Sequence, residues 1–187
     1  MDRAEPLLRE YLILSRGGQG GVTASRILAT AAVLEGKYAQ AIPQFGAERR
    51  GAIVRSYLRI SDEPIKRHSR VKQPVGVSVF SARILELMDL NSIAPTAKRV
   101  LVNSSKPVHL GDREVFYVDA TSIALELNLV IAGWPVVNTA MAAAMAKVFE
   151  IASLDSILEA MKNFFHGKLL EANLEAARRA WDRVRKA

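Results

Sequence analysis

Hydrophobic and polar positions along the chain follow two periods, and this predicts strands and helices in alternation. Short apolar runs bounded by glycine or polar residues are typical of buried strands, whereas apolar positions every three or four residues are typical of helices. The predicted strands are residues 11–15, 38–43, 53–60, 75–80, 99–103 and 115–119. The predicted helices are residues 22–34, 82–89, 121–127, 136–149, 154–165 and 169–185.

This alternation predicts an α/β fold with a largely parallel sheet. The chain has 187 residues, and its sequence contains no repeat, low-complexity tract or linker. A chain of this length can bury roughly 70% of its unfolded surface around one core. We therefore expect a single domain over residues 1–187.

The longest uncharged stretch, residues 127–146, has about the length of a membrane-spanning helix. Gly133 and Pro135 interrupt it, and its second half is mostly alanine, which is only weakly apolar. We interpret it as a loop followed by a buried helix and expect no membrane association. The N-terminus lacks the apolar core of a signal peptide, so the expected location is the cytoplasm.

The net charge of +7 is concentrated in residues 45–72, where eight basic and three acidic residues give +5. A local basic excess predicts an anionic ligand or an acidic partner surface. A basic nucleic-acid-binding protein stays open as an alternative, but aromatic residues make up only 6% of the chain and no nucleic-acid-binding motif is present. The absence of cysteine means that any iron–sulfur cluster bound through cysteines must belong to another chain.

Four glycines lie in the stretch RGGQGG, residues 16–21, between the first predicted strand and the first predicted helix. Such a loop presents backbone N–H groups and a helix N-terminus to an anion. A dinucleotide fingerprint would be Gly18-x-Gly20-x-x-Thr23, but threonine replaces the third glycine and the second strand ends without an acid. A stand-alone dinucleotide-binding oxidoreductase and a tight turn that serves only packing both remain alternatives.

A second glycine-framed loop, QFGAERRGA at residues 44–52, follows the second predicted strand. In a parallel sheet it would lie at the same edge as the first loop, so the two would share one crevice. Arg49 and Arg50 suit phosphate or carboxylate, and Glu48 can orient one of them. The alternative is a surface turn with an internal ion pair.

Together these motifs resemble the gamma subunit of the 2-oxoacid:ferredoxin oxidoreductases, the pyruvate type in particular. The resemblance rests on GGQG after the first strand, PQFGAERRGA at residues 43–52, and a strand ending in RIS and followed by Pro-Ile. It extends over nearly the whole chain, through Val102-Asn103-Ser104, Asn138, Lys168 and Asn173. Gly21 departs from it, because these subunits usually carry a branched aliphatic residue there, and strand 75–80 lacks the usual flanking aspartates.

The resemblance implies a Rossmann-like three-layer fold with a C-terminal helical segment, in a subunit that has no catalytic residue and no metal site. The complex oxidatively decarboxylates a 2-oxoacid, reduces ferredoxin and releases acyl-CoA, with thiamine diphosphate and iron–sulfur clusters in alpha, beta and delta-type partner subunits. For this subunit, the resemblance implies one set of residues that binds coenzyme A or, alternatively, contacts the alpha subunit. These residues are Gly17, Gly18, Gln19, Gly20, Glu48, Arg49, Arg50, Gly51 and Asn138.

We also expect the isolated chain to self-associate when its partners are absent. Half of its residues are hydrophobic, and the alanine-rich segment 136–146 would allow close approach of another chain.

Overall fold

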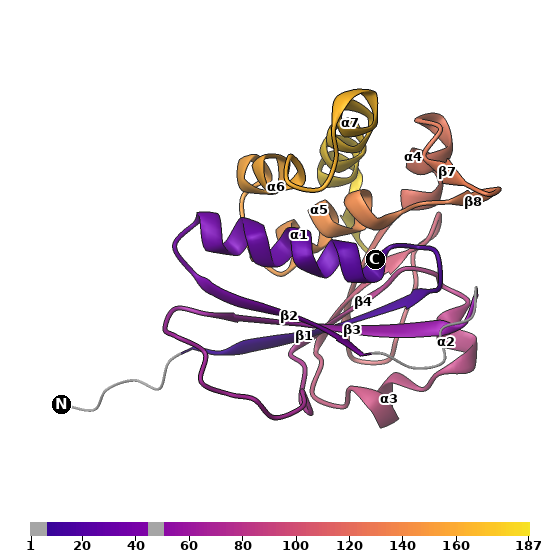
Figure 1. Cartoon of the computed structure of the whole chain (residues 1–187). Helices are drawn as coiled ribbons and strands as arrows, with labels where there is room; N and C mark the ends of the chain where they lie inside the picture. The colour runs from indigo at the N-terminus through magenta and orange to yellow at the C-terminus, as the bar shows by residue number, and fades with distance from the viewer. Residues whose placement is uncertain (1–6, 45–50) are drawn as a thin grey trace.

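A seven-stranded sheet with helices on both faces forms the protein, as seen in a computed structural model that describes residues 7–44 and 51–187 (Figure 1). The strand order in the sheet is β2-β3-β1-β4-β5-β6-β9, and β7 and β8 form a separate hairpin. The strands are β1 (Arg9–Arg16), β2 (Tyr38–Gln44), β3 (Ile53–Ser61), β4 (Gly76–Val79), β5 (Arg99–Asn103), β6 (Glu114–Val118), β7 (Val130–Ile131), β8 (Trp134–Pro135) and β9 (Arg185–Lys186). The helices are α1 (Gly21–Leu34), α2 (Ile84–Leu87), α3 (Leu90–Ile93), α4 (Ala120–Glu126), α5 (Asn138–Val148), α6 (Leu154–Met161) and α7 (Gly167–Arg183).

The centre of the sheet is parallel, as predicted, because β1, β4, β5 and β6 run in one direction. Strand β3 departs from this pattern, since it runs antiparallel between β1 and β2. The short connection after β2 explains this difference, because a parallel crossover needs a dozen or more residues. Strand β2 consequently runs in the same direction as β1, and the carboxyl ends of both strands lie at one edge.

Helices α1, α4, α5, α6 and α7 cover one face of the sheet (Figure 1). The central helix is α5, in which all residues from Asn138 to Ala146 are buried. Small alanine side chains permit this close packing against α1 and α7. The uncharged stretch 127–146 contains the predicted buried helix, preceded by the β7–β8 hairpin where a loop was predicted. No helix in the described part of the chain is long and apolar enough to cross a membrane.

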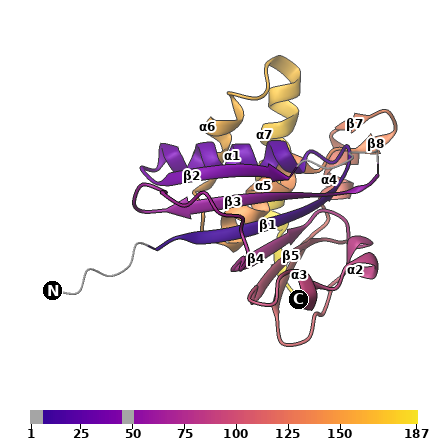
Figure 2. The ribbon, with the colours of Figure 1, turned by 60° about the horizontal axis from the view of Figure 1, so that its bottom comes forward.

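Within residues 7–44 and 51–187, the opposite face carries only the one-turn helices α2 and α3 (Figure 2). The helix predicted over residues 82–89 is present only over residues 84–87, as α2. Asp89 is extended, and its carboxylate accepts a hydrogen bond from the Asn91 amide at 2.9 Å, so it caps α3 instead of continuing α2. Aspartate favours this capping role over a position inside a helix.

One basic residue of the 45–72 segment is buried and is part of the core. The Arg59 Nε lies 2.8 Å from Glu10 Oε1, with side chains that are only 2% and 9% exposed. Its two terminal nitrogens donate to the carbonyls of Arg67 and Ser69. Arg59 therefore fastens the segment after β3 to the sheet and does not contribute to a basic surface, whereas Arg67 is exposed as predicted.

Candidate functional site

The RGGQGG loop joins β1 to α1 through two glycines in the left-handed region, Gly18 with φ of 95° and Gly20 with φ of 78°. A Cβ at Gly20 would lie 2.8 Å from the Cβ of Asn138, closer than carbon atoms can approach. Gly21 has a similar constraint, since its Cβ would lie 2.9 Å from the Cβ of Ser15. Glycine at position 21, where the resembled subunits usually carry a branched aliphatic residue, therefore allows α1 to begin in close contact with Ser15 of β1.

Gln19 holds the shape of this loop with both ends of its side-chain amide. Its Oε1 accepts a hydrogen bond from the Arg16 amide at 2.7 Å, and its Nε2 donates to the Phe80 carbonyl at 3.2 Å. Phe80 follows β4, the parallel neighbour of β1. The Gln19 side chain therefore links the ends of two adjacent strands. Its contribution to a ligand site is to hold the backbone of the loop in place.

The first turn of α1 presents a row of backbone amides at the carboxyl edge of the sheet. The Ala24 amide makes the first bond of the helix, to the Gly20 carbonyl at 2.9 Å. The amides of residues 20–23 find no acceptor in the part of the chain that the structure describes. These N–H groups form the positive end of the helix dipole, which suits an anion.

The second glycine-framed loop returns to the first loop, as predicted. Gly17 donates its amide to the Ala52 carbonyl at 2.8 Å, and the Gly51 amide lies 3.4 Å from the Gly17 carbonyl. The shared edge arises because β3 is antiparallel, not from the parallel arrangement on which the prediction rested. Three predicted site residues of this loop, Glu48, Arg49 and Arg50, lie outside the described residues.

A cavity of about 460 Å³ lies beside the glycine loop. Four predicted residues line it: Gly17, Gly18, Gly20 and Asn138. The other lining residues come from the end of β1, the first turn of α1, β3, the segment around the β7–β8 hairpin, and α7 with the residues just before it, and most of them are apolar. The sequence analysis missed this hairpin, although its turn carries Gly133 with φ of 82°.

Asn138, which begins α5, is 5% exposed and faces the loop. Its Oδ1 accepts a hydrogen bond from the Thr139 amide at 2.9 Å, which fixes the orientation of the side-chain amide. Its Nδ2 lies 2.6 Å from the position that a Cβ on Gly20 would occupy. No described residue accepts a hydrogen bond from this Nδ2, so it is an unpaired donor next to the cavity.

Asn173, from α7, also lines the cavity, but both ends of its side-chain amide make hydrogen bonds within the fold. Its Oδ1 accepts from the Thr139 hydroxyl and its Nδ2 donates to the Leu169 carbonyl, both at 2.8 Å. The first bond connects α5 to α7, and the second lies within α7. Asn173 therefore positions Asn138 through Thr139 and contributes little hydrogen-bonding capacity of its own.

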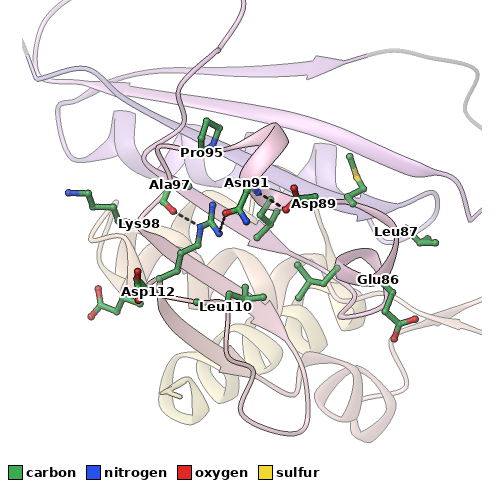
Figure 3. A pocket seen from close by; sticks show the side chains of 15 residues that line it. Glu86, Leu87, Asp89, Asn91, Pro95, Ala97, Lys98, Leu110 and Asp112 are labelled. Atoms are coloured by element: carbon green, nitrogen blue, oxygen red, sulfur yellow. Dashed lines mark hydrogen bonds between the residues drawn. The ribbon is translucent and has the colours of Figure 1, made fainter.

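A larger hollow of about 1080 Å³ lies on the other face, around α2, α3 and the start of β6 (Figure 3). Arg113 dominates its polar side, where it donates to the Ala97 carbonyl at 2.9 Å and to Asn91 Oδ1 at 2.8 Å. The hollow lies at the amino ends of β5 and β6, whereas ligands of open α/β sheets bind at the carboxyl ends. The smaller cavity at the glycine loop is therefore the better candidate site.

Comparison with known proteins connects this site to a family. Residues 10–183 match the family described as pyruvate ferredoxin/flavodoxin oxidoreductase. The chain belongs to this family. Pyruvate synthase subunit PorC of Methanothermobacter thermautotrophicus is 44% identical over 171 residues, which cover 91% of this chain and 93% of that protein. The common gamma subunit of the pyruvate/ketoisovalerate oxidoreductases of Pyrococcus furiosus is 42% identical over 90% of this chain and 93% of its own length.

Solved structures of the family confirm the fold. Pyruvate oxidoreductase subunit PORC of Thermotoga maritima superimposes with a TM-score of 0.80 at 32% identity, over 96% of this chain and 98% of that chain. A 2-oxoglutarate:ferredoxin oxidoreductase of Magnetococcus marinus has a TM-score of 0.73 at 16% identity, over 92% of this chain and 30% of that one. The second comparison shows the shared fold of one part of a longer polypeptide.

Family membership confirms the resemblance drawn from the two glycine loops. It also decides between the three function classes that the sequence left open. The relatives are gamma subunits of pyruvate and other 2-oxoacid oxidoreductases, not stand-alone dinucleotide enzymes or nucleic-acid-binding proteins. The assignment of individual residues to a ligand or to a partner subunit stays a prediction.

Proposed function

We propose that this chain is the gamma subunit of a multi-subunit 2-oxoacid:ferredoxin oxidoreductase, with pyruvate as the expected substrate. The observation that carries the proposal is 44% identity to a pyruvate synthase subunit across nearly the whole length of both proteins. The chain contains no cysteine, so the iron–sulfur clusters of such a complex would reside in other subunits. Thiamine diphosphate would likewise be bound there.

An omission experiment tests this role. The partner subunits are purified with and without this chain, and pyruvate-dependent reduction of ferredoxin is measured with coenzyme A present. The proposal expects full activity only when the chain is present, and no activity from the chain alone. Equal activity of the complex with and without the chain would contradict it.

We further propose that the glycine loops contribute to coenzyme A binding. The open amides of residues 20–23 support this role, since phosphates bind helix N-termini. Gly17, Gly18, Gly20 and Asn138 would shape the site, and Gln19 would hold the loop. Arg49 and Arg50 would supply charge, because the segment that contains them ends at Gly51, against Gly17.

Replacing Arg49 and Arg50 by alanine separates coenzyme A binding from subunit contact. Each lost charged hydrogen bond to a phosphate should cost about 1.5 to 3 kcal/mol, which raises the coenzyme A Michaelis constant by about one to two decades per arginine. If the pair instead contacts the alpha subunit, assembly weakens and this constant does not change. Arg67→Ala is the control, because Arg67 is exposed on another segment. Normal assembly with normal coenzyme A kinetics would contradict both roles.

A further inference from the structure

We propose that the cavity at the glycine loop binds a small organic monoanion, with its carboxylate or phosphodiester head on the first turn of α1 and its apolar body against the β7–β8 hairpin. The site is carried by the cavity's own residues and does not depend on the role of the chain in a complex. It shares the amides of residues 20–23 with the proposed coenzyme A site, so a monoanion and coenzyme A would compete for them.

The head of the ligand has hydrogen-bond donors ready for it. The amides of residues 20–23 have no acceptor in the described chain, and the Nδ2 of Asn138 is a further donor beside them. Asn138 is only 5% exposed, and its Nδ2 has no acceptor among the described residues, so a ligand oxygen in the cavity would be its partner. An anionic oxygen would satisfy the Asn138 donor and the helix amides together.

The rest of the cavity suits an uncharged body. Val54, Leu129 and Val136 line its interior, and Ile131 and Leu169 lie on it with 67% and 55% of their surface exposed. A volume of about 460 Å³ is within the range of small-molecule sites, which bury mostly apolar surface around a few placed polar groups. The exposed Ile131 and Leu169 would be covered by the body of a bound molecule.

The number of charges decides the class of ligand. Arg16 is the only charged residue among those of the described chain that line the cavity. One guanidinium and the dipole of α1 can compensate about one negative charge, whereas the several phosphate charges of coenzyme A would also need the charge that Arg49 and Arg50 would supply. A monoanion is therefore the ligand that this cavity fits.

Amide NMR titration of the full chain with three probes of similar body tests the inference. Ketoisovalerate carries a carboxylate, isobutyl methyl phosphate carries a phosphodiester with a single charge, and isovaleramide is neutral. We expect at least one anion to bind saturably, with a dissociation constant of about one millimolar or tighter. Its largest shifts should be at the amides of residues 20–23, and the anion that binds more tightly identifies the head group. Isovaleramide should not saturate.

Two variants sharpen the test. Asn138→Asp keeps the size of the side chain but places a carboxylate beside the head, so anion affinity should fall at least about tenfold. Asn163→Asp makes the same change of charge at an exposed position that does not line the cavity, and it should bind as the original chain does. Val54→Phe, which fills the apolar part of the cavity, should also abolish binding and guards against a folding defect in Asn138→Asp.

The inference is overturned if neither anion binds saturably to the folded chain, or if isovaleramide binds as tightly as the anions. An equal loss of affinity in Asn163→Asp and Asn138→Asp would also overturn it. Co-purification with partner subunits is measured separately for each variant. A chain that assembles but binds no monoanion would leave the proposed gamma-subunit role intact, and a chain that binds but does not assemble would do the reverse.

Discussion

At the scale of single residues, Gly20 carries two constraints that can be separated. Its φ of 78° is unfavourable for any residue with a side chain, and its Cβ would meet Asn138. Gly36 has a similar φ of 80° but nothing within 4 Å of its Cβ position. We predict that Gly36→Ala lowers the free energy of unfolding by about 1 to 2 kcal/mol through backbone strain alone.

Gly20→Ala should lower the free energy of unfolding by about 1 to 3 kcal/mol more than Gly36→Ala does, because overpacking against Asn138 adds to the backbone strain. Urea unfolding of the two variants measures the difference. Equal losses in the two variants would show that Asn138 moves aside without cost and that the close approach of α5 to the loop is not a constraint.

At the same scale, the sequence identified the residue types of the site but not every role. Gly20 and Asn138, which are 118 positions apart, meet in the structure as members of one site. Gln19 was expected to bind the ligand, yet its side-chain amide makes hydrogen bonds to the backbone of Arg16 and Phe80. Side-chain amides can bind either a ligand or the backbone, and only the position of the Phe80 carbonyl decides between them.

At the scale of elements, Arg59 links β3, β1 and the segment that follows β3. Arg59 and Arg67 both contact Glu10, at 2.8 Å and 3.6 Å, but the Arg67 side chain is 56% exposed. Arg59→Met should lower the free energy of unfolding by about 3 to 5 kcal/mol, because it leaves the Glu10 carboxylate buried without its main partner. Arg67→Met should lower it by less than about 1 kcal/mol. Chemical denaturation of both variants checks this, and a small loss in Arg59→Met would contradict the role of the buried pair.

The C-terminal strand β9 depends on a carboxylate that titrates in acid. Hydrogen bonds from Lys186 Nζ at 3.0 Å and Arg99 Nε at 2.7 Å lower the pKa of Glu114. A lowered pKa in the folded state means that the stabilisation is present above the ordinary glutamate pKa of about 4.3 and is lost as the pH falls through the folded value. We therefore predict that β9 loosens below about pH 4.

Hydrogen exchange of the Ala187 amide, which donates to the Val115 carbonyl at 2.9 Å, reports this loosening. After correction for intrinsic exchange rates, its protection should decrease on acidification in the original chain. In Glu114→Gln, protection should be lower at neutral pH and should not change with acid. An acid-dependent loss of the same size in Glu114→Gln would assign the effect to another group.

The pattern of elements was largely readable from the sequence because most helices and strands have strong periodicity. The exceptions are short: the two-residue strands of the β7–β8 hairpin and of β9 contain too few positions to show a period. The direction of β3 was also not visible, since alternation of side chains is the same in parallel and antiparallel strands. Only the short connection between Gln44 and Ile53 could have indicated it.

At the scale of the whole molecule, the expected self-association needs a different physical basis. The alanine-rich segment cannot supply it, because α5 lies inside the chain and its alanines are buried. Exposed apolar side chains lie elsewhere, including Leu125, Ile131 and Leu169, with 56%, 67% and 55% of their surface exposed. Self-association of the isolated chain stays a prediction, with these residues as its candidate contacts.

The central claim is that this chain works as one subunit of a 2-oxoacid:ferredoxin oxidoreductase. Purification of the tagged chain from its native cells, without oxygen, tests this claim most directly, followed by identification of the co-purifying chains and assay of the eluate. The account predicts equimolar partner chains rich in cysteine motifs, and pyruvate-dependent ferredoxin reduction that requires coenzyme A. A chain that elutes alone, or with partners that do not oxidise any 2-oxoacid, would contradict the account.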